Sequence, residues 1–242
     1  MKHPLLIFGI VHWGLVALLV YFSLAFWKVS WVWVLIGLII YWFVFAFVVI
    51  RILRHFYHFP IPSVMTRFID NPLRRKFMQN PDIIAERMQL KPGMIAVEIG
   101  PGKGSYTKAV AKRILPEGKV FAVDISERVI DQLKKKVEKE GITNIIPKIE
   151  DAYNFSFADE SVDRVYAVCC LPEIPDPVKV LSECRRILKS EGGLVCLCEL
   201  GFDPDYPWRK TEKRWASEAG LELAQEFGRW TAYQLHFRKK SA

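Results

Sequence analysis

The sequence of 242 residues predicts an α/β domain preceded by a hydrophobic N-terminal segment. Three observations lead to this prediction. An apolar run over residues 94–99 ends in a tight turn with alternating glycines, and a helical pattern follows it. Strand-like and helix-like segments then alternate as far as Leu197, which is the pattern of a parallel sheet. Two runs without charged residues, 5–27 and 31–50, stand before this domain.

Each uncharged run exceeds the roughly 18 apolar residues that mark a membrane span. A cleavable signal peptide has an apolar core of only about 7–15 residues that ends at small residues, and residues 5–27 have neither property. We therefore expect a two-span transmembrane anchor over residues 1–54, with a turn at residues 28–30. The basic residues that follow the second run predict, by the positive-inside rule, that both termini and the α/β domain are cytoplasmic.

Positive charge is concentrated directly after the second run. Residues 51–78 carry six basic and one acidic side chain, a net charge of +5, whereas residues 79–242 carry a net charge of only +1. This predicts a basic juxtamembrane linker over residues 55–79 that contacts membrane lipids with anionic headgroups. A nucleic-acid patch is the alternative, and the position beside a predicted span makes it the weaker one. Nothing in the sequence indicates an oligomeric state.

No metal site is expected. Cys196 and Cys198 lack the two-residue gap of a zinc knuckle and alternate along a predicted strand, which favours small buried side chains. His55 and His58 have no third ligand nearby in the sequence.

The expected elements of the α/β domain, residues 80–242, follow from hydrophobic periodicity and turn residues. The first helix begins after Asn80, an N-cap residue followed by proline, and is expected to end at about Leu90. Strands are expected over residues 94–99, 119–123, 144–149, 164–170, 193–197, 221–227 and 231–237. Further helices are expected over residues 106–115, 126–140 and 177–188, and around Trp215.

The glycine turn has the form E-x-G-x-G-x-G, from Glu98 to Gly104. A dinucleotide fingerprint requires G-x-G-x-x-G, and its last glycine is replaced by Ser105 or Thr107 in the two possible registers. The pattern resembles the first motif of the class I S-adenosylmethionine-dependent methyltransferases, in particular their small-molecule, ubiquinone- and menaquinone-methyltransferase-like group (type 11). The similarity covers about residues 72–242. It implies a Rossmann-like seven-stranded sheet with a terminal antiparallel hairpin, and S-adenosyl-L-methionine as the cofactor.

The resemblance also implies which residues contact this methyl donor. Asp124 ends the second expected strand 20 residues after Gly104, where an acidic residue binds ribose hydroxyls in nucleoside-binding folds. Asp151 and Ala152 take the place of the pair that meets the adenine ring, although an ordinary turn aspartate explains Asp151 equally well. The full set of implied cofactor-binding residues is Glu98, Gly100, Gly102, Gly104, Asp124, Ile125, Asp151, Ala152 and Cys169.

The loop after the fourth expected strand, residues 171–177, resembles the loop where substrate meets donor in this family. It lacks the histidine that is common there, so a histidine base is not implied at this place. The candidate catalytic residues are Glu173, then Tyr153 and His236, and each is equally consistent with a packing or surface role.

These features together predict a membrane-anchored methyltransferase that acts on a hydrophobic small molecule, lipid-like or quinone-like, at the membrane surface. Two alternatives stay open. The acceptor is a membrane-protein side chain or a hydrophobic thiol in the first, and the chain is a non-catalytic S-adenosylmethionine-binding module in the second.

Overall fold

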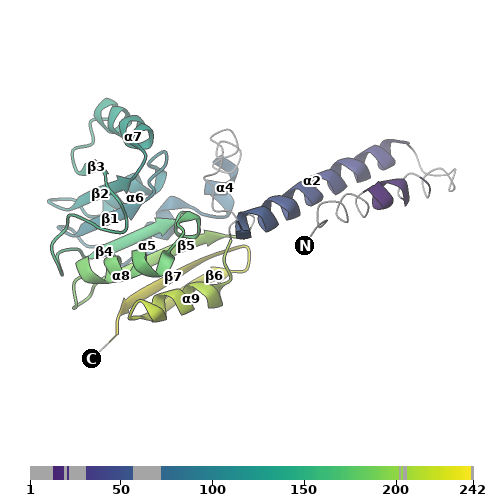
Figure 1. Ribbon diagram of the computed structural model, residues 1–242. Helices are drawn as coiled ribbons and strands as arrows, with labels where there is room; N and C mark the ends of the chain where they lie inside the picture. The colour runs from purple at the N-terminus through teal and green to yellow at the C-terminus, as the bar shows by residue number, and fades with distance from the viewer. Residues whose placement is uncertain are drawn as a thin grey trace. The chain divides into compact units, whose positions relative to one another are not determined.

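The structure, a computed structural model, describes residues 13–18, 21, 31–56, 72–201, 203 and 206–240. The chain divides into two compact units, Met1–Tyr57 and His58–Ala242. In the first unit, residues 13–18 are helical and helix α2 covers Trp31–Phe56 (Figure 1). Tyr41 stacks on Phe45 one turn along α2, with ring centroids 6.0 Å apart.

The predicted membrane anchor is not found in this structure. A span requires about 20 consecutive apolar residues within one helix. Among the described residues, no helix combines the length and the apolarity needed to cross a bilayer. This finding overturns the predicted two-span hairpin and the integral membrane location with cytoplasmic termini. Most of the first predicted run, the turn at residues 28–30 and residues 57–71 of the predicted linker lie outside the described residues.

The second unit contains a seven-stranded sheet with the order β3-β2-β1-β4-β5-β7-β6. Strands β1 to β5 are parallel to one another, whereas β7 runs antiparallel to both β5 and β6. The strands are β1 Ile95–Ile99, β2 Lys119–Asp124, β3 Ile145–Ile149, β4 Arg164–Val168, β5 Leu194–Leu200, β6 Leu221–Arg229 and β7 Ala232–Lys239. The predicted Rossmann-like sheet with its terminal hairpin is therefore confirmed.

Helices cover both faces of the sheet (Figure 1). One core contains Ile84 of α5, Val110 of α6 and Leu133 of α7, and the other contains Leu181 of α8 and Ala216 of α9. The helices of this unit are α4 Pro72–Phe77, α5 Pro81–Arg87, α6 Ser105–Arg113, α7 Glu127–Lys139, α8 Pro177–Ile187 and α9 Arg209–Glu218, with a short 3-10 helix η1 at Leu171–Glu173.

Several element ends differ from prediction for physical reasons. Helix α5 ends at Arg87, three residues before the predicted end, and the buried guanidinium of Arg164 donates to the carbonyl oxygens of Met88 and Gln89, at 2.6 and 3.0 Å. Strand β5 continues to Leu200 because β7 pairs with it along its whole C-terminal half, ending at the pair of Leu200 with Ala232.

Candidate active site

The ends of the parallel strands meet at one edge of the sheet. Because β3, β2, β1 and β4 are adjacent and parallel, the segments that follow them lie side by side there. The amide of Gly100 donates to the carbonyl of Val123 (2.9 Å), and the amide of Glu150 donates to the carbonyl of Asp124 (3.1 Å). These bonds join the glycine turn, the end of β2 and the segment after β3 into one site.

The three glycines of the turn have left-handed backbone angles and three different surroundings. A side chain at Gly100 (φ +68°) would overlap Cys170, so this glycine lets the turn approach the loop after β4. A side chain at Gly104 (φ +74°) would overlap Leu133, which packs α7 onto the start of α6. At Gly102 (φ +50°), no atom of the described residues other than its chain neighbours lies within 4 Å of the Cβ position. The turn is therefore open to a ligand at Gly102.

Glu98 supports this turn from inside the protein. Its side chain is only 1% exposed, and its Oε2 accepts a hydrogen bond from the hydroxyl of Tyr166 at 3.0 Å. Burial raises the pKa of Glu98 to about 7, because the charged form is poorly solvated there. Glu98 thus sits below the turn as a structural brace rather than on its open surface.

Asp124 and Ile125 form the next part of the edge. Asp124 is half-buried, and its Oδ1 accepts the amide N–H of Ser126 at 2.8 Å, which fixes the carboxylate at the start of α7. Desolvation by burial raises the pKa of Asp124. Ile125 is 75% exposed directly beside it, so its apolar side chain is presented to solvent at the site.

Asp151 and Ala152 follow β3 at the same edge. Asp151 is exposed, and its Oδ1 accepts the amide N–H of Tyr153 at 2.9 Å in a side-chain turn, whereas Ala152 is buried. Asp151 therefore has the structural role in a turn that was the alternative to adenine binding, and its hydrogen bond holds the segment in place.

Strand β4 ends at Val168 because Cys169 has a left-handed backbone, with φ +51°. This conformation is uncommon for a residue with a side chain, and such strain concentrates at functional sites. The Sγ atom of Cys169 accepts a hydrogen bond from Nη2 of Arg74 at 3.1 Å and from Nε2 of Gln79 at 3.4 Å. Arg74 and Gln79, which no sequence signal identified, thus bring the segment around α4 onto the end of β4.

Two of the three candidate catalytic residues lie at this edge. Glu173 is half-buried in η1, directly after the β4 end. The hydroxyl of Tyr153 accepts the amide N–H of Asp176 at 3.0 Å, so Tyr153 anchors the loop between η1 and α8.

The structure does not bring His236 to the edge. His236 is completely buried on β7 opposite Cys196, four residues before the end of β5, which is roughly 13 Å along a strand. Its ring lies 5.2 Å from that of Phe227, and desolvation by burial lowers the pKa of His236 to about 4.

Two buried carboxyl groups lie behind the end of β5 and were not anticipated from the sequence. Glu199 on β5 and Glu212 on α9 are 1% and 0% exposed. Burial, and for Glu199 also the neighbouring Glu212, raises the pKa of both groups, that of Glu212 to about 8. Their pairing depends on contact between β5 and α9, which no local sequence pattern reveals.

Exposed tryptophans flank the same edge, next to the end of β5. Trp208 is 69% exposed and Trp230 is 70% exposed. The hydroxyl of Tyr206 donates to the carbonyl of Trp230 at 2.9 Å, and the ring of Tyr206 lies 6.2 Å from that of Trp208. Since Trp230 lies in the β6–β7 turn and β7 pairs with β5 up to Leu200, this aromatic rim, defined as Tyr206, Trp208 and Trp230, lies at the carboxyl end of β5.

Comparisons with known proteins agree with this architecture. Residues 97–196 match a protein family described as a methyltransferase domain. A demethylmenaquinone methyltransferase of Geobacillus stearothermophilus is 33% identical over 124 residues, which are 51% of this chain and 53% of that enzyme. A tRNA (adenine(58)-N(1))-methyltransferase catalytic subunit of Yarrowia lipolytica is 27% identical over 59% of this chain and 36% of its own length. The matches thus span about half the length of these relatives or less.

The solved structures show the same fold. A SAM-dependent methyltransferase from Aquifex aeolicus superposes with a TM-score of 0.66 at 20% identity, covering 74% of this chain and 98% of that one. A putative sarcosine dimethylglycine methyltransferase from Galdieria sulphuraria superposes with a TM-score of 0.61 at 15% identity, covering 71% and 89%.

The second unit has the fold of class I methyltransferases, and the glycine-turn edge lies at the place that this fold provides for a ligand. Similarity to methyltransferases is thus found in the family match over residues 97–196, in the relatives and in the fold. The open backbone at Gly102 and the carboxylate of Asp124 fit a donor that carries a ribose and a charged amino-acid portion.

Proposed function

We propose that this protein transfers a methyl group from S-adenosylmethionine to a hydrophobic small molecule, lipid-like or quinone-like. The aromatic rim carries the proposal. Two tryptophans, each about 70% exposed, are costly to leave in water and provide flat apolar surfaces for a ring or a hydrocarbon chain. They stand at the end of β5, which is the neighbour of β4, the strand that ends just before Cys169. Neighbouring strands lie roughly 5 Å apart.

The similarity to demethylmenaquinone methyltransferases supports a quinone-like acceptor. The relation covers only about half of those enzymes, so the acceptor itself is part of the proposal. In such a reaction the sulfonium of the donor supplies an electrophilic methyl group. The residues at the edge then hold donor and acceptor in line, which supplies much of the rate.

The same proposal assigns roles to the candidate residues. The carboxylate of Asp124 binds the ribose, Ile125 and Ala152 flank the adenine, and the open backbone at Gly102 faces the amino-acid portion. Glu173, which follows β4 directly, takes a proton from an acceptor hydroxyl if the reaction requires it. Tyr153 positions the loop that carries Glu173, through the bond from the amide of Asp176 to its hydroxyl.

The test uses donor labelled in its methyl group. The purified chain is incubated with labelled S-adenosylmethionine and either a total lipid extract in detergent, a demethylated naphthoquinol with a short isoprenoid chain, or a polar metabolite extract. We expect label in an extractable hydrophobic product. Label confined to polar metabolites, or to protein, would contradict the proposed acceptor class.

Variants of the rim connect this activity to the structure. Trp208→Ala and Trp230→Ala should raise KM for the hydrophobic acceptor several-fold while leaving donor affinity unchanged. Leu223→Ala is the matched control, because Leu223 is 40% exposed on the same hairpin but pairs with Phe237, near the opposite end of β5. An equal rise in KM in all three variants would contradict a role of the aromatic rim in binding the acceptor.

A further inference from the structure

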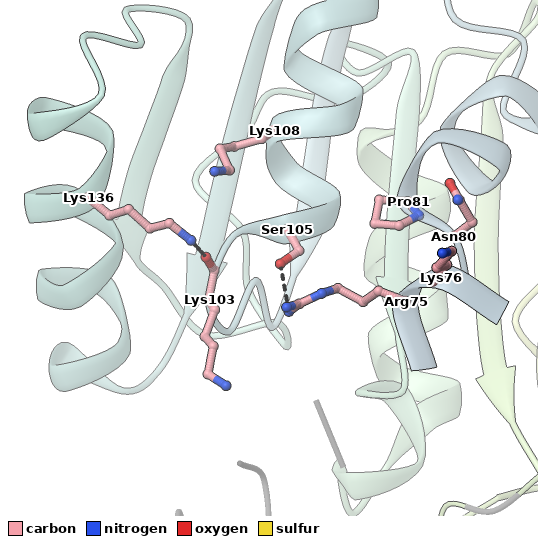
Figure 2. Close-up of a pocket in the computed structure, with 8 residues that line it drawn as sticks. All are labelled: Arg75, Lys76, Asn80, Pro81, Lys103, Ser105, Lys108 and Lys136. Atoms are coloured by element: carbon pink, nitrogen blue, oxygen red, sulfur yellow. Dashed lines mark hydrogen bonds between the residues drawn. The ribbon is translucent and has the colours of Figure 1, made fainter. Parts of the chain in front are cut away.

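Hydrogen bonds join α4 to both sides of the donor site. On one side, Arg74 and Gln79 donate to Sγ of Cys169, directly after β4. On the other side, Figure 2 shows Arg75 of α4 extending across an open hollow of about 530 Å³ to the start of α6, where its Nη1 donates to the hydroxyl of Ser105 at 3.2 Å. The glycine turn leads from β1 to α6, and β4 is the neighbour of β1. These bonds therefore bridge the edge where the donor binds.

Gln79, two residues after α4, is the centre of this bridge. It is only 2% exposed, and its Oε1 accepts Nε and Nη2 of Arg74 at 2.9 and 2.5 Å. Its Nε2 donates to Cys169 at 3.4 Å, and its carbonyl oxygen accepts the hydroxyl of Tyr106 at 3.3 Å. One buried residue thus connects α4, the first turn of α6 and the end of β4.

Helix α4 depends on such contacts for its order. It has six residues, far fewer than the roughly 12–15 at which isolated helices become even marginally stable in water. Of its described side chains, those of residues 74–77, three are basic and the fourth, Phe77, is 72% exposed. Apolar packing from these four positions therefore contributes little, and the polar bridge holds the segment. Segments of this kind open more readily than the core of a domain.

We propose that residues 72–79 form a strap over the donor site, and that Gln79 is the positioning residue that latches it. S-adenosylmethionine enters and leaves when the strap opens, and the closed strap keeps the bound donor at the glycine turn. Gln79 acts through its bonds to Arg74, Cys169 and Tyr106. The inference depends on the donor site and is independent of the proposed acceptor.

The experiment measures the association and dissociation rates of S-adenosylmethionine, by surface plasmon resonance on the immobilised full chain. Gln79→Leu removes the latch and should raise both rate constants at least fivefold, because an open strap admits the donor faster and releases it faster. Loss of a direct donor contact would raise only the dissociation rate. Gln79→Glu keeps an acceptor oxygen for Arg74, so its rates should stay within about twofold of those of the wild type.

Gln234→Leu is the matched control. Gln234 is also a buried glutamine, 1% exposed, and its Nε2 donates to the carbonyl of Ile84 in α5 at 3.2 Å. This variant loses a buried side-chain amide outside the strap, so its donor rates should equal those of the wild type. Amide hydrogen exchange without donor gives a second readout. Residues 73–79 should exchange faster in Gln79→Leu than in the wild type, while β1 stays equally protected in both.

The inference would be overturned by unchanged donor rates in Gln79→Leu, by a rise in its dissociation rate alone, or by equal changes in Gln234→Leu. Unchanged hydrogen exchange of residues 73–79 in Gln79→Leu would also overturn it. The wild type distinguishes the two levels of the account. Absence of donor binding would contradict the donor site and the strap together, whereas binding with rates that Gln79→Leu leaves unchanged would contradict the strap alone.

Discussion

At the scale of single residues, a comparison of two glycines distinguishes an effect on ligand binding from an effect of backbone strain on stability. Gly102 and Gly141 both have left-handed angles (φ +50° and +65°), and in the part of the chain that the structure describes only their chain neighbours come within 4 Å of the Cβ position. Gly102→Ala and Gly141→Ala should each lower the free energy of unfolding by about 1–2 kcal/mol. Only Gly102→Ala should also weaken donor binding, because only its methyl group would stand in the donor site. Calorimetry and urea unfolding check both parts, and equal donor affinity in the two variants would count against an open cradle at Gly102.

Glu98 makes stability depend on pH. Its pKa is raised to about 7 in the fold from the ordinary 4.5, so the folded chain binds the proton more tightly than the unfolded chain. Stability should therefore fall as pH rises from about 4.5 to about 7, by up to about 3 kcal/mol from this group. Glu98→Gln should reduce that fall.

The difference between wild type and this variant, from urea unfolding at pH 5 and pH 8, isolates Glu98. The pKa values of Glu199 and Glu212 are also raised, so these groups change the stability with pH in the same direction. Because both groups are present in both proteins, their contribution cancels in the difference. A parallel pH dependence in the two proteins would refute the assignment.

The position of a predicted site residue in the fold could be anticipated from the sequence where it depends on neighbours in the chain. The turn from Glu98 to Gly104 and the strand-end residue Asp124 are local patterns, and the fold places them at one edge. His236 was nominated by residue type alone, and pairing of β7 with β5 buries it in mid-sheet. Contacts such as that of Arg74 with Cys169 join residues 95 positions apart, and no pattern in one sequence specifies them.

At the scale of elements, strand and helix positions were largely predictable and their ends were not. All seven strands were anticipated from periodicity and turns, because each is a short apolar run between turn residues. Their ends depend on tertiary partners, such as Arg164 at the end of α5 and β7 beside β5. The left-handed angle at Cys169, which shortens β4, has no sequence signal.

Helix α8 gives a test at this scale. Asp176 is its N-cap, and Oδ1 of Asp176 accepts the amide N–H of Lys179 at 3.0 Å. Asp176→Ala should lower the free energy of unfolding by about 1 kcal/mol, whereas Asp176→Asn, which keeps the acceptor oxygen, should cost only a few tenths. Urea unfolding distinguishes the two, and equal losses would show that the cap contributes nothing to α8.

At the scale of the whole molecule, the domain His58–Ala242 accounts for the methyltransferase assignment by itself. The family match, the sheet and all predicted cofactor-binding residues lie within this domain. The uncharged runs of the N-terminal unit predicted membrane spans from composition, but no helix among the described residues meets the requirement.

Donor binding by the full chain tests the central claim most directly. We expect calorimetry to show saturable binding of S-adenosylmethionine to the wild type. Asp124→Ala should weaken it at least tenfold, because the variant loses charge-assisted hydrogen bonds to the ribose worth about 1.5–3 kcal/mol each. Glu127→Gln, three residues away and exposed at the start of α7, is the control and should bind as the wild type does. Unchanged affinity in Asp124→Ala, or no binding by the wild type, would contradict the donor site described for this fold.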